Sequence, residues 1–534
     1  MDTLRDGSDP GLLQRILRRL FLPLEALFDR AFGPAWNPFY HLGSLGFFYY
    51  WVVAASGIYL YIFFDTGLTE AYDSVQDLTH GQWYLGGIMR SLHRYASDGM
   101  VLMMVLHIVR EFSLGRYRGP RWFTWVTGTP IVWLVLACGI TGYWLVWDEL
   151  AQYVAVTSAE WLDWLPVFNG AIVRNFLSPE ALDDRFFTLL AFLHIAIPLL
   201  LLFVLWIHLQ RVSQARFLPA RGLGIGTFAM LVGLSLVQPA LSHDPANLSQ
   251  VPGRLDLDWY YLFAYPLVDA WSAGPVWLFS FLGTLFLVLI PWLPLRKQPP
   301  AAVVDLANCN GCGRCEADCP YTAIQMVPRS DGGPFEQEAL VRDDLCVGCG
   351  ICAGSCPTST PFRRASALVP GIDLPDLPLA GVRSEIDSCV AKLQGNARVV
   401  VFGCEHGVAT DGFEGDDVAT VKVPCVAALP PSFIDYVLSR DRADGVFLTG
   451  CAEGNCFYRQ GIDWTEQRIA GTRDPHLRAR VPRARLATGW YGVGGKTRLK
   501  ASLKEFQDGL QAMPKAENPG GGSSADPAAE LQEI

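Results

Sequence analysis

The chain of 534 residues is long enough to form several domains. Its net charge of −10 argues against a nucleic-acid-binding protein, because such proteins present basic surfaces to phosphates. Hydrophobic residues make up 51% of the sequence and are concentrated in long runs before residue 295, whereas the remainder has the charge content of a soluble protein. The composition therefore predicts a membrane part followed by a water-exposed part.

The first predicted element is a basic amphipathic segment at 1–35. Its stretch LLQRILRRLFLPLEALFDRAF lacks the small-residue cleavage site of a secretory signal peptide. Arginines interspersed with apolar residues are typical of a helix that lies along a membrane surface, and we expect this placement here.

Six apolar segments follow, each long enough to cross a bilayer, which takes about 20 residues. They cover roughly 44–64, 86–111, 127–147, 186–209, 223–241 and 274–293. Basic residues gather in the loops after the second, fourth and sixth segments: Arg110, Arg116, Arg118, Arg121, Arg211, Arg216, Arg221, Arg296 and Lys297. The opposite loops are acidic, so the positive-inside rule places both termini and all of the chain after 295 in the cytoplasm.

Four histidines in the second and fourth segments share one interval, because His93 and His107, like His194 and His208, are fourteen residues apart. Fourteen residues make nearly four helical turns, so each pair lies on one face, about 21 Å apart along the axis. Since both segments run in the same direction, the predicted pairs are His93/His194 near the outer face and His107/His208 near the cytoplasm. Each pair can ligate one haem iron axially. A histidine in an apolar helix can also simply bond a neighbour, but the repeated interval favours two haems.

Glycines repeat this interval in the first and third segments: Gly43 with Gly57, and Gly128 with Gly142. A glycine facing each haem would let the flat macrocycle approach the backbone, although glycines also serve helix packing. Two arginines lie three residues from a histidine and could pair with haem propionates: Arg90 and Arg110.

Residues 36–293 resemble cytochrome b of the respiratory and photosynthetic quinol-oxidising complexes. Besides the histidine and glycine pairs, the resemblance rests on three motifs: GYWLVW at 142–147, HDPAN at 243–247 and DWYYLFAYP at 258–266. It implies an all-α transmembrane bundle with two haem b, an outer quinone site and a possible homodimer. In that site Asp258 is the candidate proton-transfer group, and Tyr260 and Tyr265 would shape the pocket. Asp258 could instead be a loop residue that faces the outer water.

The chain also departs from the family pattern around both quinone sites. The family's final two spans are missing, and substitutions occur at Val146, Val154, Ser213, Leu257 and Asp258 itself, where the family has glutamate. A second hypothesis therefore stays open, namely an electron relay and docking module without a quinone site of its own. Cys138, alone in the third segment, is expected to be a buried small hydrophobe.

A Pro-rich link at 291–300 leads to a domain placed at 301–365, in which the motif C-x2-C-x2-C-x3-C-P occurs twice. This spacing is typical of ferredoxin-like α+β domains, in which the fourth cysteine of each motif binds the other cluster. One [4Fe–4S] cluster is therefore expected on Cys309, Cys312, Cys315 and Cys356, and the other on Cys346, Cys349, Cys352 and Cys319. Structural zinc is the alternative, and a cytoplasmic location argues against disulfides.

Residues 385–513 predict an α/β domain, because the apolar runs ARVVVFG, DGVFLTG and ARLATGW alternate with helical stretches. Four cysteines stand where strands end and suit one [2Fe–2S] cluster: Cys404, Cys425, Cys451 and Cys456. The spacing alone leaves a structural role open. His406 is either a further ligand or a surface histidine, and Cys389 is expected in a helix without a ligand role.

This third unit resembles the delta subunit of methyl-viologen-reducing hydrogenases, chiefly at GCAEGNCFYRQG (450–461) and ADGVFLTG (443–450). The resemblance implies a partner of the heterodisulfide-reductase type or a formate-, NAD(P)H- or hydrogen-oxidising module. The tail at 515–534 is expected to be disordered.

Together the parts predict an oxidoreductase subunit of a prokaryotic cytoplasmic membrane. Electrons from a cytoplasmic flavoprotein or iron–sulfur dehydrogenase would enter the [2Fe–2S] domain, cross the two [4Fe–4S] clusters, pass the inner and outer haems and reduce a quinone. The reverse direction is equally open. No glycine-rich nucleotide fingerprint occurs, so any flavin or NAD(P)H chemistry belongs to a partner.

Overall fold

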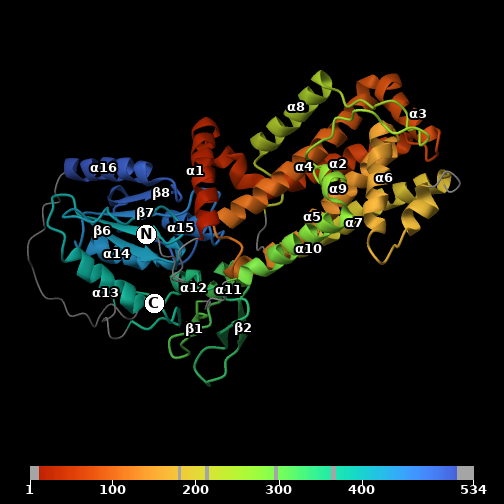
Figure 1. Cartoon of the computed structure of the whole chain (residues 1–534). Coiled ribbons are helices and arrows are strands. Elements are labelled where there is room, and N and C mark those ends of the chain that lie inside the picture. The colour runs from red at the N-terminus through yellow and green to blue at the C-terminus, as the bar shows by residue number, and fades with distance from the viewer. Residues whose placement is uncertain (1–10, 178–181, 211–215, 294–298, 363–367, 514–534) are drawn as a thin grey trace, which may run out of the picture.

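The computed structural model describes residues 11–177, 182–210, 216–293, 299–362 and 368–513. Within these ranges, long helices of the N-terminal half lie at one end of the molecule and the sheet-containing domains at the other (Figure 1). Several positions singled out in the sequence fall outside the described residues: Arg211, Ser213, Arg296, Lys297 and the tail at 515–534.

Besides the 15-residue α6 (Glu149–Asp163), seven helices of eight or more residues make up most of the described N-terminal part. They are α1 (Leu12–Phe32), α2 (Leu42–Phe63), α4 (Ile88–Ser113), α5 (Trp122–Val146), α7 (Asp184–Leu209), α8 (Arg221–Val237) and α10 (Ala273–Leu289). The most extensive helix contacts join α2 to α4 and α5 to α7. Short helices α3 (Glu70–Gln76) and α9 (Tyr265–Trp271) lie in the connecting segments.

Four helical segments are long and apolar enough to cross a membrane: Pro38–Phe63, Trp122–Val146, Asp184–Leu209 and Ala273–Trp292. They match the first, third, fourth and sixth predicted spans. The second predicted span forms α4, which carries charged residues along its length, and the fifth forms α8, which has only 17 residues. The described residues thus give an integral membrane domain with several apolar helices, while six crossings remain a prediction.

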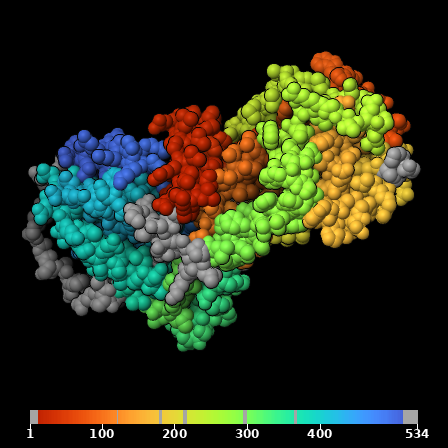
Figure 2. Space-filling view, in the orientation of Figure 1, coloured from red at the N-terminus to blue at the C-terminus, as the bar shows by residue number. Residues whose placement is uncertain are grey.

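Helix α1 joins the two ends of the molecule (Figure 2). Its buried Glu25 is paired with Arg110 of α4 at 2.6 Å, and its Asp29 is paired with Arg498 of the C-terminal domain at 3.1 Å. The opposite side exposes a row of apolar residues at helical spacing: Leu13, Ile16, Leu20, Leu24 and Leu27. Such a row suits a helix at a membrane surface, which stays a prediction.

The domain after the Pro-rich link contains two antiparallel strand pairs and two five-residue helices. Strand β1 (Val303–Val304) pairs with β4 (Ile372–Asp373), and β2 (Ile324–Pro328) pairs with β3 (Gln337–Val341). Helices α11 (Arg314–Asp318) and α12 (Ile351–Ser355) each begin after a glycine in the left-handed conformation, Gly313 and Gly350. A residue with a Cβ would be strained there, which explains the glycines between the motif cysteines.

The C-terminal domain is a parallel four-stranded sheet in the order β6-β5-β7-β8. The strands are β5 (Val399–Cys404), β6 (Val418–Val423), β7 (Gly445–Thr449) and β8 (Leu486–Gly489). Helices α13 (Leu379–Val390) and α14 (Pro431–Ser439) cover one face, and α16 (Lys496–Ala512) covers the other. Because both faces are covered, β5 and β7 are buried at every position, which explains their uninterrupted apolar sequences. Helix α15 (Gly461–Ala470) lies next to the cysteine-bearing strand ends.

Candidate functional site

The histidines of α4 and α7 meet in pairs inside the helical domain. The ring centroids of His93 and His194 are 6.2 Å apart. This separation leaves room for one metal atom between two ring nitrogens at about 2 Å each, the usual length of a metal–imidazole bond. His208 lies within electrostatic reach of His107, so the second pair also assembles between the same two helices. The donor set therefore fits two bis-imidazole haem sites.

Hydroxyl groups fix the orientation of three of these rings. The Nδ1 atoms of His93, His194 and His208 lie 3.2, 3.1 and 3.2 Å from the hydroxyl oxygens of Ser56, Thr141 and Thr127. A backbone carbonyl also accepts from each of these Nδ1 atoms: that of Val53, at 3.0 Å, for His93, and those of Cys138 and Thr124 for His194 and His208. A carbonyl can only accept, so Nδ1 carries the proton. Each hydroxyl, which itself donates to a backbone carbonyl of its own helix, accepts from Nδ1 as well. This leaves Nε2 unprotonated and available to iron.

Sequence reasoning missed these three hydroxyls, although a signal was present. Ser56, Thr127 and Thr141 each stand immediately before one of the glycines that repeat the fourteen-residue interval. The hydroxyl and the glycine are therefore parts of the same histidine-binding turn.

The glycines lie against the imidazoles in this structure, and their predicted contact with the macrocycle stays a prediction. A Cβ on Gly57 or Gly142 would lie 2.9 Å from Cε1 of its facing histidine, which is closer than real Cβ contacts. The corresponding distances are 3.2 Å at Gly128 and 3.6 Å at Gly43. The histidines of the predicted outer pair therefore leave no room for a Cβ at Gly57 and Gly142. The histidines of the predicted inner pair leave more room at Gly128 and Gly43.

The two arginines proposed as propionate partners have different surroundings. Arg90 donates to the hydroxyls of Thr79 and Ser242, at 2.5 and 2.7 Å. Arg110 is buried, and its Nε donates to the carboxylate of Glu25 at 2.6 Å. Its Nη2 has no hydrogen-bond partner among the described residues. A buried guanidinium nitrogen of this kind needs an acceptor, and a carboxylate such as a haem propionate would supply one.

The residues predicted for the outer quinone site have different surroundings in the structure. Asp258 accepts hydrogen bonds from the backbone N–H groups of Tyr260 and Tyr261 at 2.6 and 3.0 Å, and from Arg94 at 2.8 Å. The side chain of Tyr260 is exposed, whereas Tyr265 is buried with its hydroxyl 2.6 Å from that of Ser158. The substituted Val154 is fully buried in α6.

A charged group that sequence reasoning missed lies beside Asp258. Arg94 of α4 bridges Asp258 and Asp98, which is 3.1 Å away, and its guanidinium lies over the ring of Tyr143 at 4.8 Å. Tyr261 extends toward the same helix, with its hydroxyl 2.5 Å from that of Ser97. Charged residues four positions apart in a predicted span were the available signal, since such residues usually mark a functional site.

The ferredoxin-like domain assembles its cysteines in the crossed sets that the motif predicts. One pocket is lined by Cys319, Cys346, Cys349 and Cys352 together with apolar residues. Cys315 lies within electrostatic reach of the other set, Cys309, Cys312 and Cys356. Burial and these neighbouring thiols raise the pKa of Cys315 to about 12. Such thiols lose their protons together only when a cation offsets the charge, as cluster iron does.

The four C-terminal cysteines form a third group at the carboxyl ends of parallel strands. Cys425 and Cys451 both lie within hydrogen-bonding reach of Cys456, and Cys451 also reaches Cys404. Position 461 must be glycine, because a Cβ there would clash with the sulfur of Cys425. Burial and the neighbouring thiols raise the pKa values of Cys425 and Cys451. The group fits a small iron–sulfur cluster.

The remaining cysteines and His406 lie outside these groups. His406 is partly buried, its ring is stacked on Phe457 at 3.6 Å, and its Nε2 is 3.2 Å from the hydroxyl of Tyr458. It is therefore not a simple surface histidine. Cys389 lies in α13, and Cys138 is only partly buried in α5.

Comparisons with known proteins match all three parts of the chain. The family described as cytochrome b/b6/petB matches residues 27–215, a 4Fe-4S dicluster domain matches 308–360, and the delta subunit of methyl-viologen-reducing hydrogenase matches 408–514. These matches confirm the three resemblances stated from sequence.

Individual relatives include two cytochrome b6 proteins and one solved respiratory chain. Cytochrome b6 of Synechococcus elongatus is 30% identical over 182 residues, which are 34% of this chain and 84% of the relative. Cytochrome b6 of a second Synechococcus strain gives the same values. A solved chain titled "Hyperthermophilic respiratory Complex III" is similar over 48% of this chain and 75% of its own length, at 19% identity and a TM-score of 0.41.

Proposed function

Because the chain belongs to the cytochrome b family through its N-terminal part, we propose that it connects a cytoplasmic dehydrogenase to the membrane quinone pool. A cytochrome b domain fused to iron–sulfur domains supports membrane electron transfer. The finer proposal is that two haem b, two [4Fe–4S] clusters and one [2Fe–2S] cluster act in one chain. A low-potential flavin or iron–sulfur dehydrogenase would be the donor, and the chain would be the quinone-linked oxidoreductase subunit.

The observation that carries the proposal is the paired histidines with fixed tautomers. His93 and His194 have both Nδ1 atoms beside hydroxyl oxygens, so both can offer Nε2 to one iron. Bound haem b supplies reversible one-electron chemistry at this position. The role of the protein is to hold the two imidazoles on facing helices and to provide the buried Arg110 as a partner for a carboxylate.

Orientation across the membrane belongs to the same proposal. Six crossings and the arginine-rich loops would place both termini and all iron–sulfur domains in the cytoplasm. A donor protein could then reach these domains without crossing the bilayer. A homodimer, implied by the cytochrome b resemblance, remains part of the proposal.

The quinone site is proposed near Asp258 at the outer side. Reduction of a quinone takes up protons as well as electrons, and Asp258, Asp98 and Tyr261 are the groups placed there to relay them. The rival function, a relay without its own quinone site, has one specific support. Both oxygens of Asp258 already accept hydrogen bonds, so Arg94 must release the carboxylate before it can take up a proton.

The test is purification of the full chain from membranes with measurement of haem, iron and sulfide. We expect two protohaems and about ten cluster irons per chain. Decylubiquinone or a menaquinone analogue added to the dithionite-reduced protein should reoxidise the haems. Haem that no quinone reoxidises would favour the relay, and absence of a bis-imidazole spectrum would overturn the proposal altogether.

A further inference from the structure

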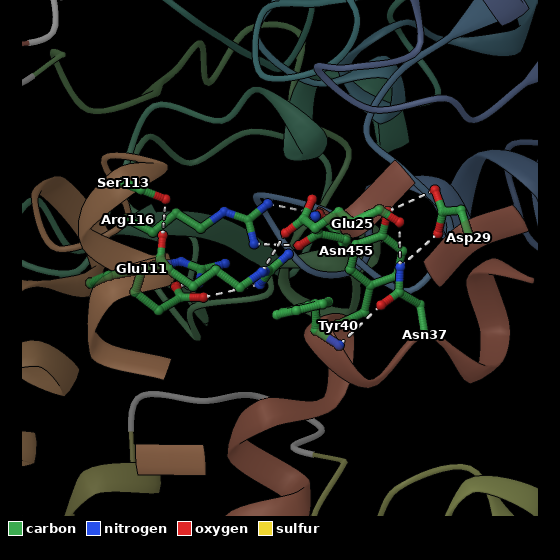
Figure 3. A network of polar contacts seen from close by, with 11 residues as sticks. Glu25, Asp29, Asn37, Tyr40, Glu111, Ser113, Arg116 and Asn455 are labelled. Atoms are coloured by element: carbon green, nitrogen blue, oxygen red, sulfur yellow. Dashed lines mark hydrogen bonds and ion pairs between the residues drawn. The ribbon is translucent and has the colours of Figure 1, made fainter. Parts of the chain in front are cut away.

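The C-terminal domain contacts the membrane domain beside its cysteines. Arg116, in the loop after α4, donates to the side-chain oxygen and, at 2.9 Å, to the backbone oxygen of Asn455 (Figure 3). Arg121 donates to the backbone oxygen of Phe457 at 2.7 Å. These two acceptors flank Cys456 in the sequence. The loop therefore docks on the turn that carries the C-terminal cysteine group.

The same loop is tied to the inner histidine on its other side. Glu111 follows His107 by one helical turn, and its carboxylate pairs with Arg121 at 3.0 Å. His107 is within electrostatic reach of Glu111 and Arg121, while Arg116 is within reach of Cys451. A short buried path of Glu111, Arg116 and Phe457 thus joins the inner haem ligand to the C-terminal cysteines.

The opposite side of the C-terminal group faces the ferredoxin-like domain. Cys349 and Cys425 belong to one buried cluster with Tyr458 and Trp464. The indole of Trp464 donates to the backbone oxygen of Asp318 at 3.2 Å, next to Cys319. Asp318 is in turn paired with the buried Arg468 at 2.5 Å. The cysteine set of Cys319, Cys346, Cys349 and Cys352 is therefore the neighbour of the C-terminal set.

The remaining ferredoxin set takes no part in the contacts just described. Its Cys312 is exposed, in contrast to the buried Cys349 and Cys352 of the adjacent set. An exposed ligand gives a soluble donor close access to a cluster, whereas the C-terminal set is enclosed between two domains.

We propose that the C-terminal four-cysteine site is the connector to the inner haem and that electrons enter at the site of Cys309, Cys312, Cys315 and Cys356. The order reverses the one expected from sequence, in which the C-terminal domain receives electrons first. It rests on the proposed function. Each transfer moves one electron from a reduced site, which is oxidised, to the next oxidised site, with no bond made or broken. The first reductant is a low-potential flavoprotein or iron–sulfur protein.

Electron spin relaxation tests which site adjoins the inner haem. The oxidised full-length protein is frozen in liquid nitrogen and reduced by γ-irradiation, which traps reduced clusters beside haems that are still ferric. A ferric haem speeds the relaxation of a nearby cluster. We expect the [2Fe–2S] signal to saturate at severalfold lower microwave power in His208→Ala, which removes the inner haem, and to be unchanged in the matched His194→Ala.

The possible results distinguish the proposed order of electron transfer from the proposed quinone-linked function. His107→Ala should reproduce His208→Ala, which excludes a local folding effect of one substitution. A [2Fe–2S] signal indifferent to the inner haem, or [4Fe–4S] signals that respond to it instead, overturns the proposed order. Failure of quinone to reoxidise the haems leaves this measurement intact and counts only against the proposed function.

Discussion

Arg116 and Asn455 are 339 residues apart in the sequence, yet the guanidinium of Arg116 donates to the backbone oxygen of Asn455 at 2.9 Å. The side chain of Arg116 is buried, and Glu111 lies within electrostatic reach of it. Burial lowers the pKa of Arg116 to about 10, so it remains charged at neutral pH. A membrane loop and a cysteine-bearing turn are therefore joined by charge-assisted hydrogen bonds, which are among the stronger ones in proteins.

Substitution of Arg116 by Gln should loosen the turn at 450–461. Loss of hydrogen bonds from a charged donor costs about 1.5–3 kcal/mol each, so local opening should become at least tenfold more frequent. Hydrogen exchange of the backbone amides in this turn measures the effect in the full-length protein. The control is Arg314→Gln, because Arg314 forms an exposed pair with Asp474 between the ferredoxin-like and C-terminal domains. Equal exchange in both variants would contradict a role for Arg116 in docking.

Alanine at the four interval glycines should give graded effects on haem content. Gly57→Ala and Gly142→Ala place a Cβ 2.9 Å from a histidine ring, so the outer haem should be largely lost. Gly43→Ala places it at 3.6 Å, an ordinary contact, and should retain the inner haem. Helix propensity alone would favour alanine at every site by about 1 kcal/mol, so the graded loss identifies the histidine contact. Haem is measured from the reduced-minus-oxidised spectrum of each purified variant, and uniform retention would refute the steric argument.

Thr141→Val should weaken the outer haem site without changing its shape. The substitution removes the hydroxyl acceptor 3.1 Å from Nδ1 of His194 but leaves the backbone acceptor of Cys138, so the tautomer is kept and the ligand becomes less basic. We expect a haem affinity about 10–100-fold lower and a higher midpoint potential of the outer haem. A redox titration that resolves the two haems measures the shift. Thr188→Val is the control, because Thr188 lies on α7 with His194 and its exposed hydroxyl donates to the backbone oxygen of Asp184 in the same helix. A matching shift there would exclude the hydrogen bond as the cause.

Asp258→Asn should slow quinone-linked turnover by at least about tenfold, because a positioned proton-transfer group contributes about 10²–10⁴-fold. Reduction of the haems by dithionite should be unaffected. The exposed Asp256 in the same loop provides the control, Asp256→Asn, which should retain the full rate. If Asp258→Asn also retains the full rate, Asp258 plays no part in proton transfer, and the relay becomes the better description.

Sequence was sufficient for the features that depend on local spacing. The fourteen-residue interval follows from the helical repeat, so His93 and His107 necessarily share a face of α4. The cysteine motifs likewise specify their own crossed grouping, which the pocket lined by Cys319 and Cys346 reproduces. The apolar runs of β5 and β7 predicted buried strands, and they are buried because helices cover both faces of that sheet.

Tertiary structure alone decided how these local units meet. The acceptors for the histidine Nδ1 atoms come from neighbouring helices, and Arg94 reaches Asp258 from 164 residues away. No local sequence pattern predicts that Cys349 lies near Cys425, or that Arg116 contacts Asn455. Short-range periodicity fixes which residues share a face, whereas contacts between distant segments depend on how whole domains pack, and a single sequence carries no spacing rule for that packing.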